Sequence, residues 1–256
     1  MPDFFIGGIQ KGGTTSLYHA ITQHPQVIPG KNKEVFYYGT TPVYQKGLNY
    51  YKSFFASVFY KKLAELKSGK PMLCVDASTN TFDSKEAPAR ILRDNPRAKM
   101  IFILRNPTER AYSHYKMAKK RGWDLADFET ALSMEEQRIE EGSTHRLSNK
   151  QHNYAYQRLG YKARGVYVDH LKHWLTDFPN EQLLITSSEL FFADPANVFN
   201  TLCKFLEIDT NVNVKFEKMN EGTNEKMDPK IKLYLDDYFK PHNEALFQLL
   251  NRRFDW

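Results

Sequence analysis

The chain has 256 residues, of which 41% are hydrophobic and 26% charged, and its formal net charge is +6. This balance excludes a disordered or fibrous chain and indicates a globular protein with a substantial core. No apolar run approaches the ~20 residues of a membrane span, so we expect no membrane partner. Met1 leads into an apolar run without a signal peptide, and two cysteines are too few for a disulfide framework. We therefore expect one cytoplasmic domain over residues 1–256, with Cys74 and Cys203 as small core residues.

The positive charge favours polyanionic ligands, and nucleic acid is the first candidate. Most basic residues are interspersed with acids, and no nucleic-acid-binding motif is present. The exception is one cluster, which comprises Lys116, Lys119, Lys120 and Arg121. We expect no nucleic-acid partner, because a doubly anionic nucleotide substrate explains the excess charge equally well.

The first predicted strand runs directly into a glycine-rich loop. Residues 4–6 (FFI) fit a buried strand, whereas Thr14, Thr15 and Ser16 suit the start of a helix. The amides of the first helical turn, the helix dipole and the Lys11 ammonium would converge there on one phosphate or sulfate. The glycines that let this turn form are Gly7, Gly8, Gly12 and Gly13.

The spacing of this loop differs from that of nucleotide triphosphatases. Their pattern G-x-x-x-x-G-K-[ST] places lysine after the second glycine, whereas counting from Gly8 puts Gly13 and Thr14 at those two positions. Lys11 precedes the glycine pair instead. The shifted lysine counts against a P-loop kinase, which stays an alternative, and a glycine-rich turn without a ligand is a further one.

Glu34 stands between basic and aromatic residues in the next stretch, 27–39. One interpretation is a surface acid paired with Lys31 or Lys33, a contact worth at most ~1 kcal/mol. The other is a general base, because an aromatic wall raises the pKa of a carboxylate by desolvation, toward the value that a base needs near neutral pH.

An aromatic, helical segment over residues 47–68 precedes a second buried strand over residues 72–76. Asp76 falls at the carboxyl end of that strand, the edge where open α/β sheets bind ligands. Contact with substrate and a turn role together with Ser78 are both open for Asp76. The expected packing face of the helical segment comprises Tyr50, Phe54, Phe55, Val58 and Phe59.

A third strand, residues 99–104, leads into a second polar motif that begins with Arg105. Asn106 is a natural N-cap, and the helix that follows carries Arg110 and Ser113 on one face. An arginine and a serine hydroxyl near a helix N-terminus make a good second phosphate site. The alternative is a capped surface helix without a ligand.

The remainder of the chain carries fewer signals. We expect an acidic helix over residues 128–141 and a polar loop or lid over residues 143–153, where His145 and His152 lack the spacing of metal ligands. We expect no metal. The other predicted elements are a strand over residues 183–186 and helices over residues 86–93, 168–178, 194–206 and 230–250.

Together these motifs resemble the sulfotransferase domains of the heparan sulfate enzymes and their bacterial relatives, which use 3′-phosphoadenosine 5′-phosphosulfate (PAPS). The resemblance covers nearly the whole chain, and the segments occur in the same order. It implies an α/β fold with a mostly parallel sheet flanked by helices, related to P-loop nucleotide-binding folds. The matching segments are 11–14 (KGGT), 33–37 (KEVFY), 86–90 (EAPAR), 105–113 (RNPTERAYS), 165–167 (GVY), 173–174 (HW), 238–243 (YFKPHN) and 254–256 (FDW).

The resemblance also implies roles for single residues. Glu34 would deprotonate the acceptor, a hydroxyl or an amine, and no metal would be needed. Arg105 and Ser113 would hold the 3′-phosphate of PAPS, and Lys226 lies in a segment similar to one that closes over it. The 5′-phosphosulfate would be held by Lys11, Gly12, Gly13, Thr14, Thr15 and Ser16.

Two departures from the family bear on the acceptor. The heparan sulfate enzymes often carry a lysine where this chain has Ala77. They are also secretory-pathway proteins with a membrane anchor and usually a disulfide, features that we do not expect in this chain. We therefore expect a small alcohol or amine as acceptor, with an intracellular saccharide as the other possibility. Asp76 and His114 are the rival bases. A non-catalytic anion or glycan binder is the alternative that would not need Glu34.

Overall fold

The computed structural model describes residues 1–144, 154–217, 219 and 225–256. Its tertiary contacts divide the chain into two compact units, one with residues 1–104 and 173–220 and the other with residues 105–172 and 221–256. The expectation of a single domain over residues 1–256 stays a prediction. Among the described helices, none combines the length and apolar character needed to cross a bilayer.

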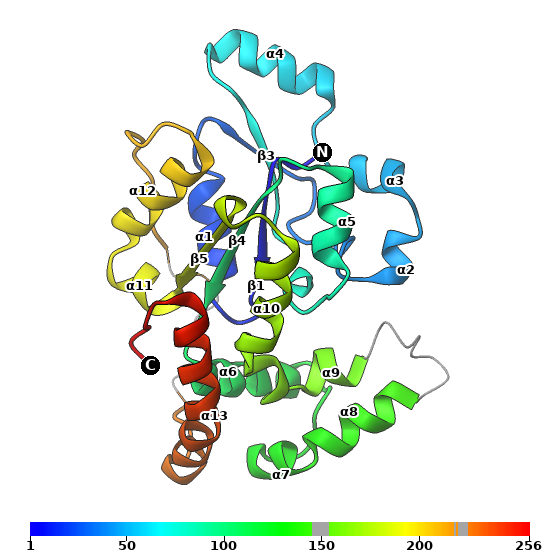
Figure 1. Ribbon diagram of the computed structural model, residues 1–256, viewed down its shortest axis with the longest axis vertical. Helices are drawn as coiled ribbons and strands as arrows, with labels where there is room; N and C mark the ends of the chain where they lie inside the picture. The colour runs from blue at the N-terminus through cyan, green and yellow to red at the C-terminus, as the bar shows by residue number, and fades with distance from the viewer. Residues whose placement is uncertain (145–153, 218, 220–224) are drawn as a thin grey trace. The chain divides into compact units, whose positions relative to one another are not determined.

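The first unit is built on a five-stranded parallel sheet with the order β2-β3-β1-β4-β5 (Figure 1). The central strand β1 has β3 on one side and β4 on the other, so the direction of winding changes beside it. Open α/β sheets bind ligands outside the carboxyl ends of strands at such a switch point. The expected α/β fold with a parallel sheet is confirmed. The strands are β1 (Phe4–Gly8), β2 (Val27–Pro29), β3 (Leu73–Asp76), β4 (Lys99–Leu104) and β5 (Leu183–Ser187).

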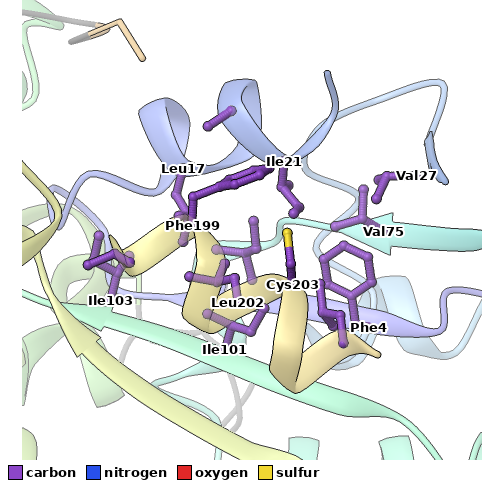
Figure 2. Close-up of a cluster of buried hydrophobic side chains, with 14 of the residues drawn as sticks. Phe4, Leu17, Ile21, Val27, Val75, Ile101, Ile103, Phe199, Leu202 and Cys203 are labelled. Carbon is purple, nitrogen blue, oxygen red and sulfur yellow. The ribbon is translucent and has the colours of Figure 1, made fainter. Parts of the chain in front are cut away.

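One face of the sheet carries the main apolar core of this unit. Alternate residues of β1 and β4, such as Phe4 and Ile101, meet Leu17 of α1 and Leu202 of α12 there (Figure 2). Cys203 is buried in the same cluster, as expected. The helices of this unit are α1 (Thr14–Ile21), α2 (Thr41–Tyr44), α3 (Leu48–Lys52), α4 (Val58–Ser68), α5 (Ala87–Asp94), α11 (Ser188–Ala193) and α12 (Pro195–Leu206).

The opposite face of the sheet is covered by aromatic side chains. Phe102 of β4 packs edge-on against Phe82 and Trp174, with ring centroids 5.0 Å and 4.9 Å away. Trp174 comes from α10 (Tyr167–Asp177), and its indole N–H donates to the carbonyl of Phe82 at 3.1 Å. This bond satisfies the buried indole and fixes the loop that follows β3.

The second unit is helical. Arg110 of α6 is buried, and its guanidinium donates to the carbonyls of Gly160 (3.5 Å) and Tyr161. The hydroxyl of Tyr161 donates in turn to the Asp124 carboxylate at 2.8 Å, which holds the α6 region to the chain after α9. The helices of this unit are α6 (Pro107–Lys120), α7 (Phe128–Ser133), α8 (Glu135–Thr144), α9 (Tyr154–Leu159) and α13 (Pro229–Leu250).

Three expectations differ from the structure. The acidic helix is two helices, because α7 ends at Ser133 and α8 begins at Glu135. The short strand β2 was not predicted. In the 47–68 segment, Val58 and Phe59 are 81% and 79% exposed, so the prediction that they belong to a packing face is wrong.

The expected lid falls largely on residues 145–153, which lie outside the described residues together with its two histidines.

Candidate active site

The glycine-rich loop between β1 and α1 packs tightly against β4. The amide of Gly12 donates to the Ile9 carbonyl at 3.0 Å, and a Cβ at Gly12 would lie only 2.5 Å from the carbonyl oxygen of Ile103. Gly13, at φ 95°, is the N-cap of α1, and Leu17 N–H donates to its carbonyl at 3.1 Å. The amides of residues 14–16 precede that bond and form the open, electropositive end of the helix.

Two residues near this loop have unusual backbone angles. Among the described residues that are not glycine, four have positive φ, and Glu207 and Asn251 do so as C-caps of helices, where this conformation is common. Lys11 (φ 69°) and Phe36 (φ 56°) instead lie in loops. This conformation costs on the order of 1 kcal/mol and often occurs at functional sites. It therefore marks the loop and the Glu34 segment as a candidate site.

The hydroxyl groups at the start of α1 have partners within the chain. The Ser16 Oγ is buried and accepts from the Met219 amide at 2.9 Å. Thr15 is half-buried, and its Oγ1 accepts from the Lys33 ammonium at 3.2 Å. An anion at this helix end would therefore meet backbone N–H groups first.

Glu34 is half-buried and is connected to this helix end. Its Oε1 accepts from Lys33 Nζ at 3.3 Å and from Thr79 Oγ1 at 3.4 Å. The same Lys33 ammonium donates to Thr15, so one cation holds both the carboxylate and the first turn of α1. Of the two lysines that the surface-acid interpretation offered as partners, Lys33 is the one that pairs with Glu34. This pairing leaves Glu34 with 31% of its side chain exposed, which is enough to meet a substrate.

Asp76 organises the backbone that directly follows Glu34. Its side chain is buried, with Tyr51 OH donating to one oxygen and Ser78 Oγ to the other, both at 2.6 Å. Ser78 Oγ accepts in turn from the amides of Val35 (3.0 Å) and Phe36 (2.9 Å). Burial raises the pKa of Asp76 to about 6, although the two donors oppose the shift. Asp76 therefore has the turn role, and through Ser78 it fixes the backbone of the two residues that follow Glu34.

This network was not predicted from the sequence. The spacing of Asp76 and Ser78 indicated a turn, but nothing in it indicated which backbone amides the Ser78 hydroxyl would meet. The sequence indicated Lys33 only as a surface partner of Glu34.

The second motif lies in the helical unit. The side chain of Asn106 accepts from the Glu109 amide at 3.2 Å, so the expected cap is confirmed. Arg105 precedes the cap, and Ser113 is half-buried on α6. Arg110 points into the core of the unit. The expectation that Arg110 and Ser113 share one face of the helix as a phosphate site is therefore wrong for Arg110. The fully buried His114, which packs 5.1 Å from Tyr161, is a poor candidate for a base.

The segment that contains Lys226 lies beside the same helix. The hydroxyl of Tyr112 donates to the Lys226 carbonyl at 3.2 Å, and Lys116 Nζ donates to the Glu225 carbonyl at 3.5 Å. Ser113 thus lies on α6, and Lys226 lies beside the same helix. Within the part of the chain that the structure describes, no group of three or more His, Cys, Asp or Glu side chains could hold a metal.

Comparison with known proteins identifies the class to which this arrangement belongs. A family profile described as "Sulfotransferase domain" matches residues 1–239. The chain belongs to the sulfotransferase family. The enzyme class expected from the resemblance is thereby confirmed.

Named relatives and solved structures agree with this family. The bifunctional heparan sulfate N-deacetylase/N-sulfotransferase 2 of Homo sapiens is 29% identical over 98% of this chain, which spans only 30% of that protein. The heparan sulfate glucosamine 3-O-sulfotransferase 5 of Mus musculus is 25% identical over 100% of this chain and 74% of its own. A sulfotransferase structure from Alicyclobacillus acidocaldarius has a TM-score of 0.80 at 24% identity, with coverage of 99% and 97%.

Proposed function

We propose that this sulfotransferase domain transfers a sulfuryl group from PAPS to a hydroxyl or amine of a saccharide or small molecule. One observation carries the proposal: the half-buried Glu34 carboxylate is held by Lys33, which also holds the first turn of α1. A general base is thus fixed beside a helix end suited to an anion. A non-catalytic anion binder would need the helix end but not the carboxylate.

The donor is supported by the family and by the loop. A mouse sulfotransferase, SULT7A1, with a TM-score of 0.53 at 15% identity over 95% of this chain and 85% of its own, was solved with 3′-phosphoadenosine 5′-phosphate (PAP). In this chain, Lys11 and the N–H groups of residues 13–16 would hold the 5′-phosphosulfate, whereas the Gly12 N–H donates to the Ile9 carbonyl and shapes the loop. Arg105, Ser113 and Lys226 would hold the 3′-phosphate. Lys11 precedes the glycine pair, which disfavours the P-loop kinase alternative.

In the proposed reaction, Glu34 accepts the proton of the acceptor group as the acceptor oxygen or nitrogen attacks sulfur in line. A new bond to sulfur forms while the bond between sulfur and the 5′-phosphate oxygen breaks, and PAP leaves with the electron pair of that bond. Lys11 and the loop amides stabilise the charge that grows on the leaving phosphate. Lys33 orients the Glu34 carboxylate through the contact at 3.3 Å while it also binds Thr15.

The acceptor is proposed more broadly than the donor. The names of two relatives support a saccharide, because they are heparan sulfate sulfotransferases. Only part of the first of them is matched, so its whole activity does not carry over. Ala77 replaces the lysine that the glycan enzymes often carry, which supports a small alcohol or amine instead.

Calorimetry tests the donor, and turnover tests the reaction. PAP should bind with a strong preference over AMP and ATP, because only PAP presents a 3′-phosphate to Arg105 and Ser113. Labelled PAPS with a panel of glucosamine-containing oligosaccharides, small alcohols and amines should then give one labelled product class. Equal affinity for AMP and PAP would contradict the donor site. Tight PAP binding without transfer to any acceptor would favour the non-catalytic binder.

A further inference from the structure

Helix α4 (Val58–Ser68) presents its apolar side chains to solvent. Phe59 is 79% exposed, Leu63 40% and Leu66 75%, and none of the helix residues is buried. Spacings of four and three residues put these side chains on one face of the helix. A surface helix of a globular protein ordinarily turns such a face to the core. In α4 the amphipathic pattern is inverted.

The polar face of α4 attaches the helix to the sheet. Lys61 Nζ pairs with the Asp3 carboxylate at 2.6 Å, and the Glu65 carboxylate accepts from the Met72 amide at 3.2 Å. Asp3 immediately precedes β1, and Met72 immediately precedes β3. Figure 1 shows α4 standing apart from the sheet and from the other helices of the first unit. The helix is therefore held with its apolar face outward.

Basic residues border this apolar face. Lys62 and Lys67 are exposed and form no ion pair with any described residue, whereas the only acid of the helix, Glu65, lies on the attached side. An apolar strip between lysines is complementary to a surface with anionic groups above an apolar layer. A second copy would present the same lysines and no acid on this face, so charge complementarity favours an anionic surface over a second copy as the partner.

We propose that α4 is a membrane-surface helix that binds the first unit to an anionic bilayer. This differs from the expectation of no membrane partner, because that expectation considered only segments long enough to span a bilayer. Phe59, Leu63 and Leu66 would enter the boundary between headgroups and acyl chains, while Lys62 and Lys67 contact anionic headgroups. A helix of eleven residues with three apolar side chains on its outward face suits reversible binding in the plane of the interface. The anionic cytoplasmic leaflet has the required charge. This surface is independent of the proposed chemistry.

Vesicle sedimentation with the full chain tests the proposal. The protein should bind vesicles of 7:3 phosphatidylcholine and phosphatidylglycerol, and bind pure phosphatidylcholine about tenfold or more weakly, because the lysines require anionic lipid. The double variant Phe59→Ser/Leu66→Ser should lose about tenfold or more of its partitioning. Lys62→Glu/Lys67→Glu should lose binding to the anionic vesicles selectively.

Matched controls show whether the loss of binding is specific to α4 or follows from removing any exposed apolar side chain or any two positive charges. Leu125→Ser removes a side chain that is 90% exposed in the other unit, and Lys204→Glu/Lys240→Glu changes charge equally elsewhere. Both controls should bind as the unaltered protein does. Circular dichroism and the midpoint of thermal unfolding should be unchanged in all variants, because α4 contributes no buried residue. Binding that the α4 variants leave intact, or no vesicle binding at all, would overturn the proposal. So would concentration-dependent dimerisation that Phe59→Ser/Leu66→Ser abolishes.

Discussion

Glu34 is the residue on which the proposed chemistry depends. Glu34→Gln keeps the shape of the side chain and removes its basicity, so we expect turnover to fall by about 10²- to 10⁴-fold, the usual contribution of a general base. PAP affinity should change by less than about twofold, because no proposed donor contact involves Glu34. Steady-state rates and calorimetry measure the two effects. Glu86→Gln, an exposed acid of the same unit, is the control and should retain normal turnover. Near-normal turnover of Glu34→Gln would refute the assignment.

Asp76 should make stability depend on pH in a specific window. Its folded pKa is raised from 3.8 to about 6, so the folded state holds the proton more tightly. The resulting stabilisation is fully present below pH 3.8 and is lost as the pH rises through about 6, a change of about 3 kcal/mol. Asp76→Asn removes this titration. In urea unfolding, the stability advantage of the unaltered protein over Asp76→Asn should therefore shrink from pH 4 to pH 7. A constant or growing advantage would contradict the shift.

At the scale of elements, the accuracy of the sequence predictions follows from burial. Strands β1, β3, β4 and β5 are apolar runs with clear ends, so their sequences identify them, whereas β2 has three residues and ends in Pro29. The face of α4 was wrongly predicted because the pattern rule assumes that apolar residues point inward. The glycine-rich loop between β1 and α1 could be predicted because the spacing of its residues is a local property of the sequence. The Asp76–Ser78 network was not, because it depends on residues 35–36 approaching residue 78 in the folded chain.

The loop between β1 and α1 should tolerate no side chain at Gly12. A Cβ there would lie 2.5 Å from the Ile103 carbonyl oxygen, a backbone atom of β4 that cannot easily move. We expect Gly12→Ala to lower the free energy of unfolding by about 2–3 kcal/mol, as overpacking does. Gly69→Ala is the control: Gly69 has φ 66° and no heavy atom within 4 Å of the place that a Cβ would occupy, so only backbone strain of about 1 kcal/mol applies. Equal losses in urea unfolding would show that the close contact is unimportant.

At the scale of the whole molecule, the residues proposed for the donor belong to both units. Lys11 and the loop lie in the first, and Arg105, Ser113 and Lys226 in the second. In the chain, each motif directly follows a strand: the loop follows β1, and Arg105 follows β4, which ends at Leu104. A sequence pattern could identify both motifs because each is continuous in the chain.

A ligand that binds only the folded chain stabilises it by mass action, and this gives a test of the proposed assignment. PAP at 100 times its Kd should add about 2.7 kcal/mol, which corresponds to about 5–10 °C in the midpoint of thermal unfolding for a chain of this size. Arg105→Ala should weaken PAP by tenfold or more through loss of a charge-assisted contact, and should lower that shift at the same PAP concentration. Arg97→Ala, an exposed arginine of the first unit, should show the full shift. Because AMP lacks the 3′-phosphate, its shift should be small and should not change in Arg105→Ala. An equal shift with AMP, or an undiminished PAP shift in Arg105→Ala, would remove Arg105 from the donor site.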